Sequence, residues 1–311
     1  MARSMMRLAE LRPWWGRMVS CAPVGNRRST AIGRGRQAGY QPAAGFQPAP
    51  QIGNICRHIL RASIFCLLAW PAFAQPKHYR CPRATSPIRI DGRLNDAAWR
   101  KASWTDNFVD IQGAGHPQPR LRTRVKMLWD DEYFYVGAEL EEPHVWATLT
   151  EHDSVIFHDN DFEVFLNPSG DGRNYFEFEI NALNTGWDLF LPKPYREGGT
   201  ADNSWEIPGL RTAVHVNGTL NDPADRDRGW SVEMAFPWTA FASRAPVQKP
   251  AAGDQWRVNF SRVEWRTRIS GGKYVKAPHL PEDNWVWSPQ GLINMHVPER
   301  WGYVTFAASG N

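Results

Sequence analysis

Cysteine is nearly absent from most of this chain. Only four of its 311 residues are cysteine, and Cys21, Cys56 and Cys66 precede residue 75, so Cys81 stands alone in the remainder. A single thiol can form neither an internal disulfide nor a cysteine metal site. The stability of residues 75–311 must therefore come from an apolar core, for which one all-β domain of this length is large enough.

Long hydrophobic runs are also missing. The apolar run Ile64–Trp70 is far shorter than the ~20 residues that cross a bilayer, so we expect no membrane span. Two arginines precede this run and Ala72-Phe73-Ala74 follows it, which is the three-part pattern of a secretory signal with a small-x-small cleavage site. We therefore predict a signal peptide at 57–74, an unstructured or mis-assigned start at 1–56, and a secreted or periplasmic product.

Positive charge is scarce after the predicted cleavage site. Residues 1–74 hold ten of the 36 basic residues and one of the 32 acidic residues, which leaves 26 basic against 31 acidic residues, a net charge of −5. An exported domain of this charge would repel phosphate backbones. We expect no nucleic-acid partner.

Helical periodicity over more than two turns is absent, and strands do not alternate with helices. Short alternating segments separated by Gly, Pro and Asp turns predict instead an antiparallel β-sandwich in a single domain, 75–311. The predicted strands are 88–90, 121–129, 133–140, 161–166, 175–180, 209–216, 229–236, 255–265 and 301–306, with short helical turns at 95–99 and 237–241.

The segments 161–166 and 175–180 predict a hairpin with two different faces. Apolar and acidic residues alternate in both, so Phe162, Val164, Phe176 and Phe178 are predicted in the core, and Asp161, Glu163, Glu177 and Glu179 on the opposite face. Like charges this close repel unless they are solvated, paired with cations or given a hydroxyl-rich ligand. The nearby aromatic and amide side chains that a polar ligand could use are Phe157, Asn181, Asn184 and Trp187.

Tryptophan is abundant, with 13 of 16 falling after residue 74. Strand or helix positions predict a core role for Trp99, Trp129, Trp230, Trp256 and Trp301. Loop positions beside Pro and Asn make Trp205, Trp285 and Trp287 candidates for ligand contact.

Signals for a cofactor are weak. The histidines after residue 74 are scattered, without a close pair on one strand face. Asp222, Asp225 and Asp227 could gather calcium, but arginines interrupt the run and no bidentate Glu closes it, so a solvated turn is the alternative. We expect no cofactor, with a structural calcium ion left open.

Six short motifs occur in an order typical of one family. They are Ile90-Asp91-Gly92 with Ala98-Trp99, Trp129-Asp130 with Tyr133–Val136, Asn160–Phe165, Gly229–Glu233, Trp256–Phe260 and Trp285–Ser288. Together they resemble carbohydrate-binding module family 9-like proteins over about Pro87–Phe306.

The resemblance implies a β-sandwich that holds a sugar in a shallow slot between two aromatic rings. The first ring falls on Phe157, six residues before Glu163, where the family has tryptophan, and the second on Trp287 of the Trp287-Ser288 pair. Glu179, beside a matching Asn181, replaces a basic residue of the family. From the residues themselves, the Arg262 guanidinium could donate hydrogen bonds to both Glu163 and a sugar hydroxyl, or form a purely structural ion pair with Glu163.

These observations predict non-catalytic binding of a mono- or oligosaccharide end, alongside glycan-degrading enzymes. The predicted ligand-binding residues are Phe157, Glu163, Glu179, Asn181, Arg262 and Trp287, with no catalytic residue. A glycoside hydrolase is the alternative, since Glu177 and Glu179 would stand ~7 Å apart along their strand, within the range that two catalytic carboxyl groups use.

Overall fold

The computed structural model describes residues 75–242, 244 and 249–308, and the predicted signal peptide and start lie outside them. The strands are β1 His78–Cys81, β2 Val109–Asp110, β3 Thr123–Trp129, β4 Tyr133–Glu141, β5 Asp161–Asn167, β6 Tyr175–Asn181, β7 Gly186–Leu191, β8 Arg211–Asn217, β9 Gly229–Pro237, β10 Gln255–Glu264, β11 Thr267–Ser270, β12 Lys273–Lys276, β13 Asp283–Val286 and β14 Gly302–Phe306. The short helices are η1 Ala97–Lys101, η2 Ile156–His158, η3 Tyr195–Glu197, α1 Trp238–Phe241 and η4 Pro298–Arg300.

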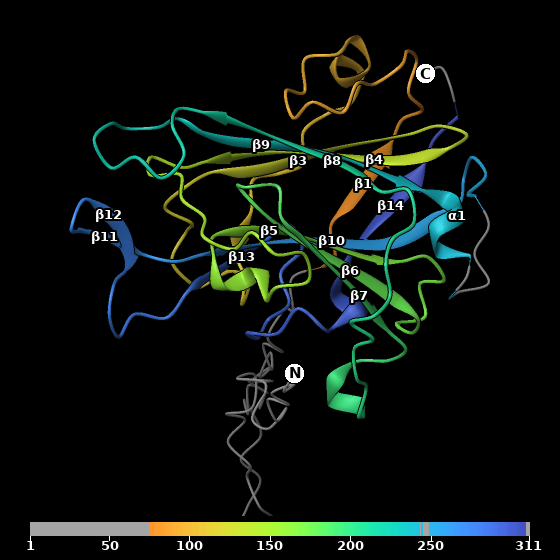
Figure 1. Ribbon diagram of the computed structural model, residues 1–311. Coiled ribbons are helices and arrows are strands. Elements are labelled where there is room, and N and C mark those ends of the chain that lie inside the picture. The colour runs from red at the N-terminus through yellow and green to blue at the C-terminus, as the bar shows by residue number, and fades with distance from the viewer. Residues whose placement is uncertain (1–74, 243, 245–248, 309–311) are drawn as a thin grey trace, which may run out of the picture. The chain divides into compact units, whose positions relative to one another are not determined.

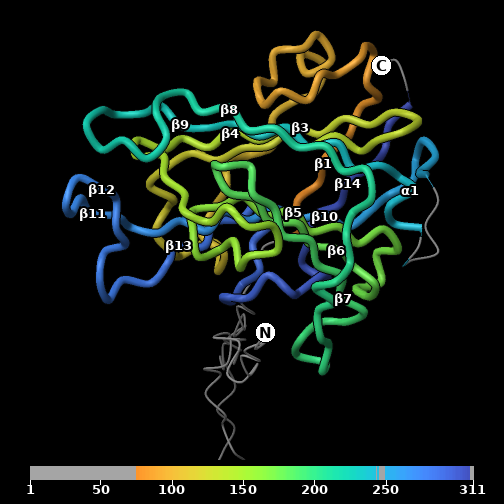
Figure 2. The backbone as a smooth tube through the Cα atoms, in the orientation of Figure 1, coloured from red at the N-terminus to blue at the C-terminus, as the bar shows by residue number. Residues whose placement is uncertain are grey.

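Two sheets face each other, as the sequence predicts. The larger sheet has the order β1-β14-β10-β5-β6-β7, with β13 beside β10 and β2 beside β13, and the smaller sheet has the order β3-β4-β9-β8. Neighbouring strands are antiparallel except for β1 and β14, which run parallel. In Figure 1, β3, β4, β8 and β9 form the upper layer and β5, β6 and β10 the lower, and the backbone trace in Figure 2 shows the same two layers. The fold is a β-sandwich.

The main core lies between the sheets, where the apolar residues of alternating strands meet. Phe162 on β5 pairs in register with Ile180 on β6, and its ring stacks on that of Phe260 on β10 with centroids 5.8 Å apart. Phe162, Val164, Phe176 and Phe178 are all buried, which confirms the predicted hairpin and its inward face. Burying large apolar side chains of this kind contributes about 1.5–3 kcal/mol each.

One predicted strand is wrong. Residues 88–90 join no sheet, because backbone groups around them donate to side chains instead. Arg89 N–H donates to Asp96, and the N–H groups of Asp91 and Gly92 both donate to one carboxylate oxygen of Glu233, at 2.8 Å. The helical turns at η1 and α1 form where predicted, with Trp99 fully buried.

Five of the eight tryptophan predictions are right. Trp99, Trp129, Trp230, Trp256 and Trp301 are buried as predicted. Trp205, Trp285 and Trp287, predicted to contact ligand from loops, are also buried, with 5%, 3% and 1% exposed. Their apolar area is worth more in the core than in water, so tertiary packing overrides the loop-like sequence context.

Cys81 is a buried free thiol in the described part of the chain. Among those same residues, no helix is long and apolar enough to cross a membrane.

Candidate functional site

The four predicted carboxylates do share one face of the larger sheet, the face turned away from the smaller sheet. Glu163 on β5 lies directly opposite Glu179 on β6, while Asp161 and Glu177 flank this pair along their strands. All four are buried, with at most 5% exposed. The interpretation of this face as a solvated surface is therefore wrong.

Burial without a counter-ion governs the electrostatics of this acidic face, which we define as Asp161, Glu163, Glu177 and Glu179. Among the described residues, no Lys or Arg forms an ion pair with any of the four. Burial raises the pKa of Glu163 to about 7, against the opposing effect of the Ser261 hydroxyl. Burial, and then the charge of Glu163, raises the pKa of each of the other three well above its usual value. Burial therefore favours the protonated form of each of these carboxyls, compared with a carboxyl in water.

Several polar atoms of this face lack a hydrogen-bond partner within the described chain. Asp161 uses Oδ1 to accept from the Val263 N–H at 3.0 Å, but its Oδ2 has no partner. Oε2 of Glu177 and the indole Nε1 of Trp187 are buried and equally unpartnered. A buried polar group without a partner costs about 1–3 kcal/mol, so a ligand that supplied donors and an acceptor here would be favoured.

Two partly exposed rings border the acidic face. Trp187 on β7 lies opposite Glu179, and its ring centroid is 6.3 Å from that of Phe157 in η2. The backbone N–H of Phe157 donates to Glu179 Oε2 at 3.0 Å, which ties η2 to the carboxylates. Phe157 thus borders the acidic face, and the ring beside it is that of Trp187 rather than the predicted Trp287.

Trp287 does not face Phe157. Its backbone N–H donates to the Phe260 carbonyl, and the centroids of the two rings are 5.9 Å apart. Both rings lie in the core between the sheets. The ring also lies so close over Gly302 that a Cβ there would meet it at 2.4 Å. The predicted slot between Phe157 and Trp287 is therefore wrong, because the larger sheet separates the two rings.

Arg262 is likewise on the other face of the sheet. Ser261 is the β10 residue opposite Glu163, so its neighbour Arg262 points between the sheets. There its guanidinium pairs with Glu264 at 2.8 Å and with Glu142 at 3.0 Å. Arg262 therefore neither donates to Glu163 and a sugar hydroxyl together, as predicted, nor forms the alternative Glu163–Arg262 ion pair.

Asn181 lies near the acidic face but is committed to the fold. Its amide Nδ2 donates to the Leu149 carbonyl at 2.9 Å and to Asp159 Oδ2 at 3.0 Å. Its Oδ1 accepts from the N–H groups of Leu183 and Thr185, and none of its surface is exposed. Asn181 therefore holds the turn after β6.

Carboxylate oxygens of Asp161, Glu163 and Glu179 all lie within 4.8 Å of one another, a donor set that suits a hard cation. The Asp222–Asp227 run is not solvated throughout, because Asp227 is buried. Asp225 accepts from the Thr219 hydroxyl, and Asp227 accepts from the N–H groups of Thr219 and Val145.

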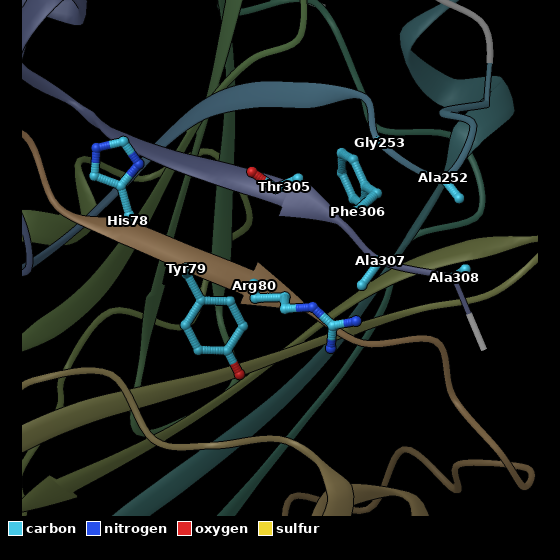
Figure 3. Close-up of a pocket in the computed structure, with 9 residues that line it drawn as sticks. All are labelled: His78, Tyr79, Arg80, Ala252, Gly253, Thr305, Phe306, Ala307 and Ala308. Atoms are coloured by element: carbon cyan, nitrogen blue, oxygen red, sulfur yellow. The ribbon is translucent and has the colours of Figure 1, made fainter. Parts of the chain in front are cut away.

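A hollow elsewhere on the domain is lined by residues of β1, of β14 and of the segment before β10, and Figure 3 shows Arg80, Thr305 and Gly253 among them. In the order of the larger sheet, these strands are at the opposite end from β6 and β7. The hollow brings together no cluster of carboxylates. The acidic face with its two rings is the stronger candidate.

Fold and sequence place the chain in a family of sugar-recognition modules. Residues 90–263 match the model of the carbohydrate family 9 binding domain-like family, which is more than half of the chain. The chain belongs to this family.

Two curated relatives are similar over about half of the chain. An exoglucanase, XynX, from Acetivibrio thermocellus is 25% identical over 154 residues, which cover 49% of this chain and 12% of the relative. An endo-1,4-beta-xylanase A from Thermoanaerobacterium saccharolyticum is 23% identical over 151 residues, which cover 49% of this chain and 11% of the relative. The chain thus matches only a small part of each enzyme.

Solved structures share the fold at low identity. A family 9 module from Caldicellulosiruptor kristjanssonii in complex with cellotriose superposes with a TM-score of 0.50 and 18% identity, covering 76% of this chain and 96% of the module. A candidate carbohydrate-binding protein from Bacteroides uniformis gives a TM-score of 0.55 and 16% identity, covering 74% and 99%.

Proposed function

We propose that this domain binds a mono- or oligosaccharide on the outer face of the larger sheet, without catalysing a reaction. The observation that carries the proposal is the acidic face, where Asp161 Oδ2 and Glu177 Oε2 lack donors, beside the partly exposed rings of Trp187 and Phe157. A pyranose has hydroxyl groups that donate to carboxylates and an apolar CH face that packs on a ring. Membership of a family of carbohydrate-binding modules supports the same ligand class.

Each residue has a distinct role in this proposal. Trp187 supplies the stacking face, and its indole N–H can donate to a sugar oxygen. Glu163 and Glu179 accept hydroxyl hydrogen bonds, and a carboxyl that keeps its proton can also donate one. Phe157 supplies the second ring, beside that of Trp187.

The domain would work outside the cytoplasm, in support of enzymes that break down glycans. The predicted signal peptide and the exoglucanase and xylanase names of the relatives support this setting. In such a role, binding keeps an enzyme near its polysaccharide and raises the effective substrate concentration.

Glycoside hydrolysis is the second candidate. A carboxyl with a raised pKa next to other carboxylates is what a general acid needs, and Glu163 has a pKa of about 7. Against this, the family to which the chain belongs is one of carbohydrate-binding domains.

The experiment combines a glycan array with a reducing-sugar assay on the same protein. The proposal expects retention of at least one glycan class with no release of reducing ends. Release of reducing ends that Glu163→Gln abolishes would favour the hydrolase. No binding to any glycan on the array would contradict the proposed function.

A further inference from the structure

A second cluster of metal-binding side chains lies at the β7 edge of the larger sheet. It joins His152 and Asp153, from the loop before η2, to Asp188 on β7 and Glu206 from the segment before β8. Three separate parts of the chain therefore contribute to it. It is distinct from the acidic face, because Asp188 pairs in register with the core residue Phe178 and points to the opposite side of β7 from Trp187.

The donor atoms gather around one imidazole nitrogen. His152 Nε2 is 3.5 Å from Asp153 Oδ1, 3.7 Å from Asp188 Oδ1 and 3.0 Å from Glu206 Oε2. One donor atom each from His152, Asp153 and Asp188 lies within 4.8 Å of the other two. Ligands of one tetrahedral zinc ion, bound at about 2.0–2.2 Å, stand roughly 3.3–3.6 Å apart. The observed distances from His152 Nε2, 3.0–3.7 Å, bracket that spacing.

Asp188 gives an independent indication of a missing ligand. The residue is 3% exposed, and its Oδ2 accepts from the Ile207 N–H at 2.7 Å, which fixes the orientation of the carboxylate. Its Oδ1, the oxygen turned toward His152, is buried and has no hydrogen-bond partner. Hydrogen-bonded outer partners of this kind orient a metal-binding carboxylate.

The surrounding backbone holds the loop in place. The N–H of Asp153 donates to the carbonyl of Gly186 on β7 at 3.1 Å, so His152 and Asp153 are tied to the strand that carries Asp188. His152 keeps about half of its side chain exposed, and Glu206 keeps 60%. An ion can therefore enter from solvent, and Glu206 can turn toward it.

We propose that His152, Asp153 and Asp188, completed by Glu206, bind one divalent transition-metal ion of the zinc class. One imidazole nitrogen with several carboxylate oxygens is a mixed donor set, which zinc accepts in tetrahedral geometry. Calcium prefers six to eight oxygen ligands and would bind more weakly. A bound ion would fasten the loop before η2 to β7.

The competing explanation is an ion pair in which a protonated His152 balances its carboxylates. Partial burial lowers the pKa of His152, but the hydrogen bond to Glu206 and the charges of Asp153 and Asp188 outweigh it and raise the pKa. The ion-pair explanation predicts no stoichiometric metal binding.

Isothermal titration of zinc chloride into the chelator-treated full chain, without sugar, tests the proposal. We expect one ion per chain and at least ten-fold weaker binding for His152→Ala, with calcium chloride as a weaker-binding comparison. His116→Ala is the matched control, because His116 is also an exposed imidazole beside a single carboxylate, Asp110 at 4.0 Å, and should bind zinc as the wild type does.

Two further measurements keep the test decisive. Asp188→Asn should also weaken zinc binding, in a variant whose circular dichroism shows the wild-type fold. Saturating zinc should raise the melting temperature of the wild type but not that of His152→Ala. Equal zinc affinity in His152→Ala and the wild type, or no zinc binding by the wild type, would overturn the site. Neither result bears on sugar binding.

Discussion

Glu163 and Glu179 lie directly opposite each other on two neighbouring strands, both buried and neither paired with a cation among the described residues. Like charges in this arrangement destabilise a sheet, and desolvation adds to the cost. Burial raises the pKa of both carboxyls, that of Glu163 to about 7, which favours their protonated forms and so lowers this cost. A fold that keeps such a pair gains a buried layer rich in hydrogen-bonding oxygens.

The first prediction concerns pH. The pKa of Glu163 is raised from 4.5 to about 7 on folding, so the native state binds this proton more tightly than the unfolded state does. Its contribution to stability is therefore fully present below about pH 4.5 and is lost as the pH rises to about 7, by up to roughly 3 kcal/mol. The groups that face it are Asp161 on β5, Glu177 and Glu179 on β6, Ser261 on β10 and Trp187 on β7.

Urea denaturation at pH 5, 6, 7 and 8 measures this effect by comparing the wild type with Glu163→Gln. The wild type should lose more stability with rising pH than the variant, because glutamine does not titrate. The difference reports on Glu163 together with the three carboxyls whose pKa its charge raises. It excludes groups outside this face such as His296, whose burial lowers its pKa to about 3 and gives the opposite slope. If the free energy of unfolding changes with pH in the same way for the two proteins, the pKa of Glu163 is not raised on folding.

The second prediction separates the two tryptophans. Trp287→Ala should lower the free energy of unfolding by about 3–5 kcal/mol, because it leaves a large cavity beside Phe260. Trp187→Ala should cost far less, since its ring is only partly buried. Chemical denaturation of both variants measures the difference. Equal losses would contradict the placement of Trp287 in the core.

The third prediction concerns the buried ion pairs between the sheets. Arg262→Met leaves Glu142 and Glu264 buried without their main cation and should cost about 3–5 kcal/mol. Arg266→Met is the matched control, because Arg266 is 53% exposed and only 3.5 Å from Asp283, where an ion pair is worth at most about 1 kcal/mol. If both variants unfold at the same urea concentration, Arg262 does not hold the sheets together.

Sequence predicted the hairpin and its faces because strand alternation is a local property. Phe162 and Phe178 point inward and Glu163 and Glu179 outward, as their spacing requires. The pairing of β5 with β10 is not local, and it puts Ser261 rather than Arg262 opposite Glu163. Alternation along β10 already gives Arg262 the inward face of Val258 and Phe260, and the predicted contact with Glu163 did not take this into account.

The rings show the same limit. The sequence marks Trp187 only as a neighbour of the hairpin, and its place opposite Glu179 requires the register of β6 with β7. Trp287 follows the end of β13, where no local pattern says which side of the sheet it covers. The His152 cluster draws on three separate segments, so no spacing in the sequence could indicate it.

The central claim is that sugar binds at the outer face beside Trp187. Trp187→Ala removes a stacking face worth about 1–3 kcal/mol, by analogy with bases on aromatic rings, or roughly a five- to 150-fold loss in affinity. Trp104→Ala is the control, since Trp104 is also partly exposed but lies beside Arg124 on β3, in the smaller sheet. Isothermal titration of the best glycan from the array should show that loss for Trp187→Ala and wild-type affinity for Trp104→Ala. Wild-type affinity in Trp187→Ala would contradict the account.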